Sequence, residues 1–427
     1  MDKFVIEGGH RLKGDVLISG SKNASLPILA ATLLTDASCT INHVPLLDDI
    51  ETLLLLFRHL GVKTDRDDEH ISIDASAIST VEATYDIVRK MRASVLVLGP
   101  LLARFGRARV SLPGGCAIGA RPIDIHLKGL EAMGATIVLE HGYVDATAPA
   151  GGLVGAKIVL DNPSVGATEN LMMAAALARG TTVIENAARE PEIVELAEAL
   201  MSMGVPVQGA GHSTIVIEGS DCVGSMNHTV GPDRIETGTF IAVASATQSE
   251  ITLRRVRPDQ LETIVSHFIQ AGCEFTSLKG SYTDARLMDL QVKGPERLKA
   301  VDIKTAPYPG FATDMQAQFS ACMALAEGTS HVEETIFENR FMHVLELMRM
   351  GADITLHGHL AVVRGVSKLS AAPVMATDLR ASASLVIAAL AAHGCREILR
   401  IYHLDRGYCK LENKLQLLGA KVRREKA

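Results

Sequence analysis

The feature of this 427-residue chain that most constrains its fold is a unit that recurs six times. In each copy an amphipathic helix ends at a glycine, which a small residue and a new strand follow. Successive glycines of this kind are 68 to 79 residues apart, and they are Gly61, Gly134, Gly204, Gly272, Gly351 and Gly419. Periodicity on this scale indicates a duplicated supersecondary unit. The glycine itself suits the left-handed conformation that commonly ends a helix.

The order of elements within the unit also repeats: a strand, a turn, an apolar helix, a second strand, a loop, an amphipathic helix and one or two short strands. The first copy predicts strands at 16–18 and 40–42 and helices at 26–34 and 50–60. The first helix of a unit is apolar on almost every side, as at 171–178, 240–246, 319–326 and 385–392. Helices of this kind are buried all round. We therefore expect an α/β fold with sheets outside a core of helices.

Six units exceed what one core can hold, because single cores stop growing near about 250–300 residues. We therefore predict two domains of three units each. A cluster of glycine and small polar residues at 222–230 is typical of a linker, and the strand at 4–6 precedes the first unit and is expected to pair elsewhere. The predicted domains are 22–229, which contains Cys116, and 1–21 plus 230–427, with the active site in the cleft between them.

Composition excludes several classes of protein. Hydrophobic residues make up 47% of the chain and charged residues 21%, as in a soluble α/β protein. The net charge of −7 argues against a nucleic-acid binder. A helix needs about 20 apolar residues to span a bilayer, and every apolar run in this sequence is much shorter. Seven cysteines without a C-x-x-C pair fit neither a disulfide framework nor a zinc ribbon. With no signal-peptide pattern either, we expect a cytoplasmic protein without metal or cofactor.

The loop at 111–122 contains one thiol, three glycines and an arginine. Glycines let the backbone approach a ligand closely, and Arg121 favours the thiolate of Cys116 and can bind a phosphate or carboxylate through two hydrogen bonds. A single cysteine is more often a small buried hydrophobic residue. The proline and glycines nevertheless place Cys116 on an irregular segment, where functional residues concentrate. The loop is also long enough to act as a lid.

Basic and polar residues stand at the predicted starts of the buried helices. Helix amino termini present unpaired N–H groups and positive potential, so a cation there builds an anion site. The residues at these turns include Lys22, Asn23, Arg92, Ser164, Asp314 and Arg380. A second set of loops, between the second strand and second helix, contains Arg340, Arg406 and Cys116. The sequence therefore predicts chemistry on an anionic substrate.

From end to end the chain resembles the UDP-N-acetylglucosamine 1-carboxyvinyltransferases, or enolpyruvyl transferases. The motifs that carry the resemblance lie at 20–23, 113–122, 232–239, 313–318, 337–341 and 377–382. The resemblance implies a two-domain inside-out α/β barrel with three repeats in each domain, in agreement with the periodicity. It also implies that the enolpyruvyl group of phosphoenolpyruvate is transferred to the 3-hydroxyl of UDP-N-acetylglucosamine with release of phosphate, the first committed step of peptidoglycan precursor synthesis.

The resemblance further implies roles for individual residues. Cys116 resembles the acid that protonates phosphoenolpyruvate and reacts with fosfomycin, and Asp314 resembles the base for the sugar hydroxyl, with Lys22 and Arg406 completing the catalytic set. The implied phosphoenolpyruvate ligands are Lys22, Asn23, Arg121, Arg380 and Arg406. The implied nucleotide-sugar surface is Asn23, Arg92, Arg121, Pro122, Ile123, Asp124, Ile125, Ser164, Val165, Gly166, Asp314 and Ile336. Arg340 and Asp378 are implied to support the site.

Two positions depart from the commonest family pattern. Ala312 stands where a proline precedes Thr313, and Asn162 stands where some members have a lysine. The change at Ala312 puts in question the turn that holds Asp314. The change at Asn162 puts in question one contact with the nucleotide. Three alternatives remain: the shikimate-phosphate enolpyruvyl transferase, which lacks the cysteine loop; a paralogue of the same activity; and a non-catalytic nucleotide-sugar binder, which would not require both an acid and a base.

Overall fold

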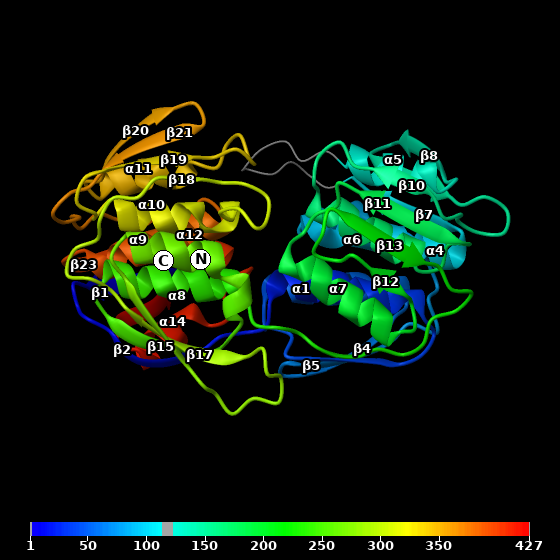
Figure 1. The fold of residues 1–427 in the computed structure, drawn as a ribbon, viewed down its shortest axis with the longest axis horizontal. Helices are drawn as coiled ribbons and strands as arrows, with labels where there is room; N and C mark the ends of the chain where they lie inside the picture. Colours follow the sequence, from blue (N-terminus) through cyan, green and yellow to red (C-terminus); the bar gives the residue numbers. More distant parts are fainter. Residues whose placement is uncertain (1, 113–122, 427) are drawn as a thin grey trace. The chain divides into compact units, whose positions relative to one another are not determined.

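The computed structural model describes residues 2–112 and 123–426. These residues form two compact units (Figure 1). The terminal unit contains residues 2–19 and 232–426, and the inner unit contains residues 20–112 and 123–231. Three residues singled out from the sequence, Cys116, Arg121 and Pro122, lie outside the described residues.

Within the described residues each unit contains three four-stranded sheets, and all six sheets share one topology. A short first strand pairs in parallel with the second, which pairs antiparallel with the third, which pairs antiparallel with the fourth. One sheet of the inner unit runs in the order β10 (Lys157–Val159), β11 (Thr181–Glu185), β13 (Thr214–Glu218), β12 (Val207–Gln208). A sheet of the terminal unit repeats it with β18 (Ile303–Lys304), β19 (Thr329–Glu333), β21 (Leu360–Arg364), β20 (Asp353–His357). The sixfold repeat predicted from the sequence is confirmed.

The other four sheets follow the same rule. In the inner unit they are β14 (Asn227–Thr229), β3 (Cys39–Asn42), β5 (His70–Asp74), β4 (Lys63–Asp67), and β6 (Glu82–Ala83), β7 (Arg107–Ser111), β9 (Tyr143–Thr147), β8 (Thr136–Glu140). In the terminal unit they are β2 (Lys13–Leu17), β15 (Glu250–Val256), β17 (Met288–Lys293), β16 (Glu274–Leu278), and β22 (Val374–Met375), β23 (Gly394–Leu399), β1 (Asp2–Gly8), β24 (Lys421–Lys426).

Two sheets correct the prediction from the sequence. The strand predicted at 16–18 for the first repeat is β2, and it pairs in parallel with β15 of the fourth repeat. The segment 222–230, predicted to be a linker, contains β14, which pairs in parallel with β3. The chain passes from one unit to the other just after β2 and again just after β14. The last strand before each crossing therefore belongs to the unit that the chain is leaving. β2 completes a sheet of the terminal unit, and β14 completes a sheet of the inner unit.

The first and the last described strands lie in one sheet of the terminal unit. β1 pairs antiparallel with β23 on one side and with β24 on the other, with Phe4 opposite Ile398 and Arg424. Phe4 and Ile6 are fully buried because alternate residues of β1 face the core. The expectation that the strand at 4–6 pairs outside the first repeat is confirmed.

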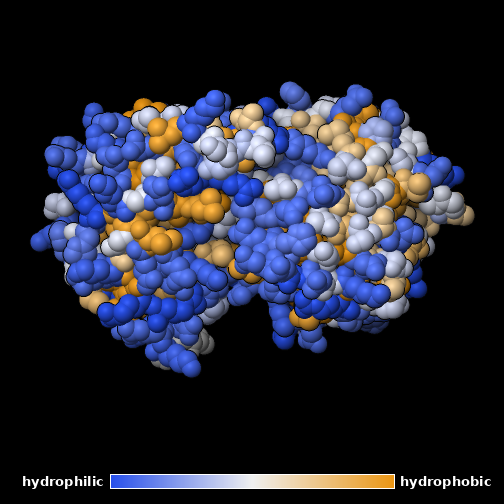
Figure 2. Space-filling view, turned by 90° about the horizontal axis from the view of Figure 1, so that it is seen from below, coloured by the Kyte–Doolittle hydropathy of each residue, from blue (hydrophilic) through white to orange (hydrophobic). Residues whose placement is uncertain are grey.

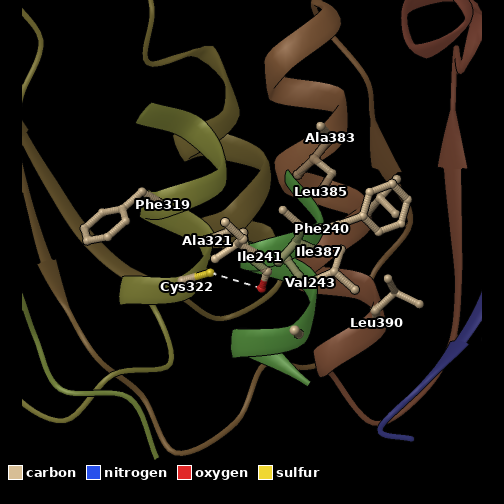
Figure 3. Close-up of a cluster of buried hydrophobic side chains, with 14 of the residues drawn as sticks. Phe240, Ile241, Val243, Phe319, Ala321, Cys322, Ala383, Leu385, Ile387 and Leu390 are labelled. Atoms are coloured by element: carbon tan, nitrogen blue, oxygen red, sulfur yellow. Dashed lines mark hydrogen bonds between the residues drawn. The ribbon is translucent and has the colours of Figure 1, made fainter. Parts of the chain in front are cut away.

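Apolar helices fill the centre of the terminal unit, as expected. α8 (Arg234–Ala246), α10 (Gln316–Met323) and α12 (Leu379–Ala391) pack against one another, and almost all of their residues are buried. Figure 3 shows buried side chains from all three helices, among them Ile241 of α8, Ala321 of α10 and Leu385 of α12. The Cys322 thiol donates a hydrogen bond to the Ala242 carbonyl at 3.4 Å. Alanines at the contacts let the helices approach closely, and the sheets then cover them.

The inner unit is built in the same way. Its central helices are α1 (Lys22–Ala31), followed by η1 (Thr32–Leu34), α4 (Leu98–Phe105), preceded by η2 (Arg92–Val97), and α6 (Val165–Ala175). The amphipathic helices of the two units are α2 (Asp48–Leu60), α5 (Asp124–Ala132), α7 (Pro191–Ser202), α9 (Glu262–Gln270), α11 (Met342–Arg349) and α14 (Leu411–Leu417). Shorter elements are α3 (Tyr85–Val88), η3 (Pro258–Gln260), η4 (Thr313–Met315) and α13 (Tyr402–Asp405).

A second glycine recurs directly after the third strand of a sheet, at a place where the strand passes very close to the end of a buried helix. Gly365 follows β21, and a Cβ there would lie 1.6 Å from the carbonyl oxygen of Ala326. Gly219 follows β13, and its Cβ would lie 1.7 Å from the carbonyl oxygen of Ala178. Real Cβ atoms do not approach an oxygen so closely. Only glycine therefore fits where these strands cross the end of a buried helix.

In the described part of the chain, no helix is long and apolar enough to cross a membrane. Hydrophilic residues cover much of the face shown in Figure 2, and hydrophobic residues reach the surface between them in patches of different size.

Candidate active site

The terminal unit holds a carboxylate between two arginines from different repeats. Asp314 lies in η4, immediately before α10. Its Oδ1 lies 2.6 Å from Arg340 Nη2, and its Oδ2 lies 2.8 Å from Arg380 Nη2 and 3.2 Å from Arg380 Nε. Arg340 lies between β19 and α11, and Arg380 in the first turn of α12. We call Asp314, Arg340 and Arg380 the carboxylate clamp.

Burial and charge together set the state of the carboxylate clamp. The side chains of Arg340 and Arg380 are only 6% and 4% exposed, whereas that of Asp314 is 26% exposed. Burial alone would raise the pKa of Asp314, but the charges of Arg380 and Arg340 and their hydrogen bonds outweigh it and hold the pKa well below its ordinary value. Asp314 is therefore ionised, and it is a weak base while both arginines bind it.

A ring of polar side chains from the central helices holds Arg380. Asp378 caps α12, and its Oδ1 accepts hydrogen bonds from the N–H groups of Arg380 at 2.8 Å and Ala381 at 3.0 Å. The guanidinium donates to the Tyr408 hydroxyl at 3.2 Å and lies over the Tyr408 ring, 5.5 Å from its centroid. That hydroxyl is in turn 2.9 Å from Thr239 Oγ1. Tyr408 therefore holds the guanidinium, and Asp378 holds the backbone that bears it, independently of Asp314.

Glu334, directly after β19, ties the clamp to the neighbouring loop. It is fully buried. Its carboxylate accepts hydrogen bonds from Thr305 Oγ1 (2.9 Å), Thr313 Oγ1 (2.8 Å) and the N–H groups of Ile336 (2.9 Å) and Phe337 (3.3 Å). Thr313 Oγ1 also accepts from Arg340 Nη1 at 2.8 Å. One buried carboxylate therefore positions the turn that bears Asp314, the loop that bears Ile336 and, through Thr313, Arg340.

Ala312 departs from the family pattern without disturbing this turn. It precedes η4 with φ −63° and ψ 125°. A proline ring fixes φ near −65°, so Ala312 adopts the backbone conformation that a proline would impose. The Ala312 carbonyl accepts a hydrogen bond from the Met315 N–H at 2.9 Å, which closes the turn.

In the inner unit, the residues singled out from the sequence lie at helix starts. Lys22 and Asn23 open α1, which Ser21 caps by accepting a hydrogen bond from the Ala24 N–H at 3.2 Å. The Lys22 ammonium lies 2.9 Å from Asp49 Oδ2, and both side chains are largely buried.

The other inner-unit residues follow the same pattern. Arg92 opens η2, Ile123 precedes α5, which begins with Asp124 and Ile125, and Ser164 caps α6, which begins with Val165 and Gly166. Helix starts of this kind present unpaired N–H groups and positive potential.

Asn170 binds three of these helices together. Its Nδ2 donates to the Val95 carbonyl in η2 at 3.0 Å, and its Oδ1 accepts from the Gly99 N–H in α4 at 2.6 Å. The Nδ2 also lies 3.1 Å from His126 Nδ1 in α5. Burial, followed by the charge of Arg92, lowers the pKa of His126 to about 4, so this imidazole is neutral near pH 7.

Arg406 ends α13 in the terminal unit. Burial and then the charge of Arg406 lower the pKa of His403, while Asp378 acts in the opposite direction. Among the described residues singled out from the sequence, Asp314, Arg340 and Arg380 therefore meet directly, Asp378 holds the backbone of Arg380, and Ile336 joins them through Glu334.

Sequence reasoning missed Glu334, Tyr408 and Asn170. A signal was present for two of them. Asn170 is a polar residue within a helix whose residues from Ala167 to Ala175 are all buried, and Glu334 is an acidic residue directly after a strand with alternating burial. Buried polar groups of this kind need partners, and so they mark networks. Tyr408 carried no such signal because its partners come from helices far away in the sequence. In the described ranges, no group of three or more His, Cys, Asp or Glu side chains is placed to hold a metal ion.

Comparison with known proteins covers nearly the whole chain. The family model "EPSP synthase (3-phosphoshikimate 1-carboxyvinyltransferase)" matches residues 6–415. The UDP-N-acetylglucosamine 1-carboxyvinyltransferase of Trichlorobacter lovleyi is 58% identical over 424 residues, which is 99% of each chain. The enzyme of the same name from Geotalea uraniireducens is 56% identical over 422 residues, again 99% of each chain.

Solved structures show the same fold. The enolpyruvyl transferase NikO from Streptomyces tendae superposes with a TM-score of 0.88 at 26% identity, covering 100% of this chain and 99% of that one. An EPSP synthase from Acinetobacter baumannii superposes with a TM-score of 0.78 at 20% identity, covering 100% of both chains. The architecture is therefore the two-domain inside-out α/β barrel expected from the sequence.

Proposed function

This chain belongs to the carboxyvinyltransferase family that includes the EPSP synthases and the UDP-N-acetylglucosamine 1-carboxyvinyltransferases, and we propose that it transfers the enolpyruvyl group of phosphoenolpyruvate to the 3-hydroxyl of UDP-N-acetylglucosamine. The observation that carries this proposal is the identity of more than half of all residues, along nearly the full length, with relatives of that name. The reaction releases phosphate and is the first committed step of peptidoglycan precursor synthesis, in the cytoplasm.

The proposed reaction proceeds by addition and elimination. Cys116 protonates the methylene carbon of phosphoenolpyruvate, which leaves positive charge on the adjacent carbon. The sugar oxygen attacks that carbon while Asp314 takes the hydroxyl proton, giving a tetrahedral intermediate. Loss of a proton from the new methyl group and departure of phosphate then restore the double bond. An acid and a base must therefore flank the reacting carbon.

The cationic residues position a multiply charged substrate and hold the departing phosphate. We assign phosphoenolpyruvate binding to Lys22, Asn23, Arg121, Arg380 and Arg406. The buried Arg380 supports this assignment, because its guanidinium already binds a carboxylate here: Nε and Nη2 both donate hydrogen bonds to Asp314 Oδ2. Of these residues, Lys22 and Asn23 belong to the inner unit, and Arg380 and Arg406 belong to the terminal unit.

The nucleotide-sugar surface is assigned to Asn23, Arg92, Arg121, Pro122, Ile123, Asp124, Ile125, Ser164, Val165, Gly166, Asp314 and Ile336. Its support is the row of helix starts in the inner unit, since helix amino termini favour the negative charge of a diphosphate. Arg340 and Asp378 support the site, the first by its contact with Asp314 and the second by capping α12.

An assay of phosphate release tests the proposed function. We expect release from phosphoenolpyruvate only when UDP-N-acetylglucosamine is also present, and loss of that release in Cys116→Ala. Release with shikimate 3-phosphate in place of the nucleotide sugar would contradict the assignment. Binding of the nucleotide sugar without any turnover would instead identify a non-catalytic binder.

A further inference from the structure

We propose that phosphoenolpyruvate frees its own catalytic base: its carboxylate replaces that of Asp314 on Arg380 and Arg340, and the released Asp314 then accepts the proton of the sugar hydroxyl. This inference rests on the proposed function, because it requires a substrate that carries a carboxylate. It assigns Asp314 two successive roles, first as an occupant of the substrate's carboxylate site and then as the base.

The geometry of the carboxylate clamp is that of an occupied carboxylate site. Asp314 Oδ2 receives two hydrogen bonds from the Arg380 guanidinium, and Oδ1 receives one from Arg340. The two guanidinium side chains are almost completely buried, whereas Asp314 is partly exposed. A carboxylate that reaches the clamp from solvent therefore meets Asp314 first and competes for the same donors.

Arg340 also has a donor that Asp314 does not use. Its Nε is buried, and within the described residues it has no hydrogen-bond partner. A buried donor without a partner is costly, so the guanidinium favours a ligand that reaches it. A substrate carboxylate that bridges Nε and the neighbouring Nη2 would make one hydrogen bond more with Arg340 than Asp314 makes.

The arginines stay in place when Asp314 leaves. Arg380 donates to Tyr408 and stacks on its ring, and the Asp378 carboxylate caps its helix. Arg340 donates to Thr313 and lies over the Phe337 ring, 5.1 Å from its centroid. Neither set of contacts involves the Asp314 side chain. The site is therefore preorganised for a carboxylate, and preorganisation lowers the cost of binding.

Two other carboxylates are close to Arg380, and each of them caps a helix. Asp233 acts on Arg380 through its charge, but its Oδ1 caps α8 by accepting from the N–H groups of Ile235 and Glu236. Asp378 caps α12 in the same way. Asp314 Oδ2, in contrast, accepts hydrogen bonds from the Arg380 guanidinium itself.

The exchange would change the chemistry of Asp314. The two guanidinium groups hold its pKa well below the ordinary range, which makes it a poor proton acceptor. Once released, the carboxylate loses those interactions and regains basicity, since partial burial then raises its pKa. The base therefore becomes effective only after phosphoenolpyruvate is bound.

Binding of phosphoenolpyruvate to Asp314→Asn tests the exchange. The substitution keeps the shape of the side chain and removes the competing charge. We would measure the dissociation constant by equilibrium dialysis with labelled phosphoenolpyruvate, with Cys116→Ala present throughout so that no adduct forms. Removal of a competitor that makes charge-assisted hydrogen bonds is expected to tighten binding at least about tenfold. Should Asp314→Asn fail to fold, Asp314→Ser provides the same comparison.

Two controls separate exchange from a general gain in attraction. Inorganic phosphate has no carboxylate, so its affinity should change much less than that of phosphoenolpyruvate. Asp353→Asn removes one charge from an exposed position of the same unit, where Asp353 pairs with Arg364, and it should leave both affinities unchanged. Unchanged or weaker phosphoenolpyruvate binding in Asp314→Asn, or an equal gain for inorganic phosphate, would overturn the exchange.

The proposed function is judged by a different result. Phosphate release by the unaltered protein with both substrates does not depend on whether Asp314 exchanges with the substrate carboxylate. If release occurs and Asp314→Asn binds phosphoenolpyruvate no more tightly, the transferase assignment stands and the exchange is wrong.

Discussion

Replacing Glu334 tests whether one buried carboxylate holds the catalytic turn. In Glu334→Ala the hydroxyls of Thr305 and Thr313 and two backbone N–H groups would lose their acceptor. Four hydrogen bonds to a buried charged group, at about 1 kcal/mol each after relaxation, give an expected destabilisation of about 3–5 kcal/mol. Glu334→Gln keeps the acceptor on the side of Thr305, Ile336 and Phe337, so we expect it to cost only about 1–2 kcal/mol.

Two measurements on the same variants check this expectation. Urea unfolding gives the loss of stability, and phosphate release gives kcat and KM. Because Glu334 positions the turn of Asp314 and the loop of Ile336 without contacting substrate, we expect Glu334→Gln to recover most of the stability and part of the activity lost in Glu334→Ala. The adjacent Glu333 is the matched control: it is 43% exposed and pairs with Lys304 at the surface. Glu333→Gln should change stability by no more than about 0.5 kcal/mol.

The reasoning would be refuted if Glu334→Ala unfolded at the same urea concentration as Glu333→Gln. It would also be refuted if Glu334→Ala lost stability while kcat and KM remained unchanged, because the network would then support the fold but not the catalytic turn.

Three further outcomes follow from the structure. Gly365→Ala should destabilise the protein by more than about 3 kcal/mol because its Cβ has no room, whereas Gly224→Ala, with its nearest contact at 3.5 Å, should change little on urea unfolding. Burial lowers the pKa of His343 to about 4. The contribution of neutral His343 to stability is therefore complete above its unfolded pKa of about 6.5, and on the order of 3 kcal/mol is lost as the pH falls toward 4. His343→Gln should flatten this dependence of the unfolding free energy on pH. Fosfomycin, with the nucleotide sugar present, should add one equivalent of mass at Cys116, and an unmodified protein would contradict that role.

Much of the fold could be predicted from the sequence because each repeat is determined by residues that are close together in the sequence. The closing glycines and the apolar helices depend on neighbouring residues, and the structure confirms the helices predicted at 26–34 and 50–60 as α1 with η1 and as α2. The partners of β2 and β14 could not be predicted, because each pairs with a strand about 200 residues away and the short strands themselves carry no mark of their partner.

The site was predictable residue by residue but not as an arrangement. Lys22, Arg380 and Asp314 stand out as polar residues at helix starts. Their contacts do not, since Asp314 pairs with residues 26 and 66 positions away. Nor does the sequence reveal that Asp314 is held as a weak base, because that property comes from two guanidinium groups brought together by the packing of different repeats.

The proposed addition and elimination is tested most directly by running the reaction in deuterium oxide and analysing the nucleotide-sugar product by mass spectrometry and NMR. We predict an enolpyruvyl ether at the 3-hydroxyl with deuterium in its methylene group, because the methylene carbon gains one solvent hydrogen and then loses one of three. A product whose methylene group contains no deuterium, or phosphate release without any ether, would contradict the account.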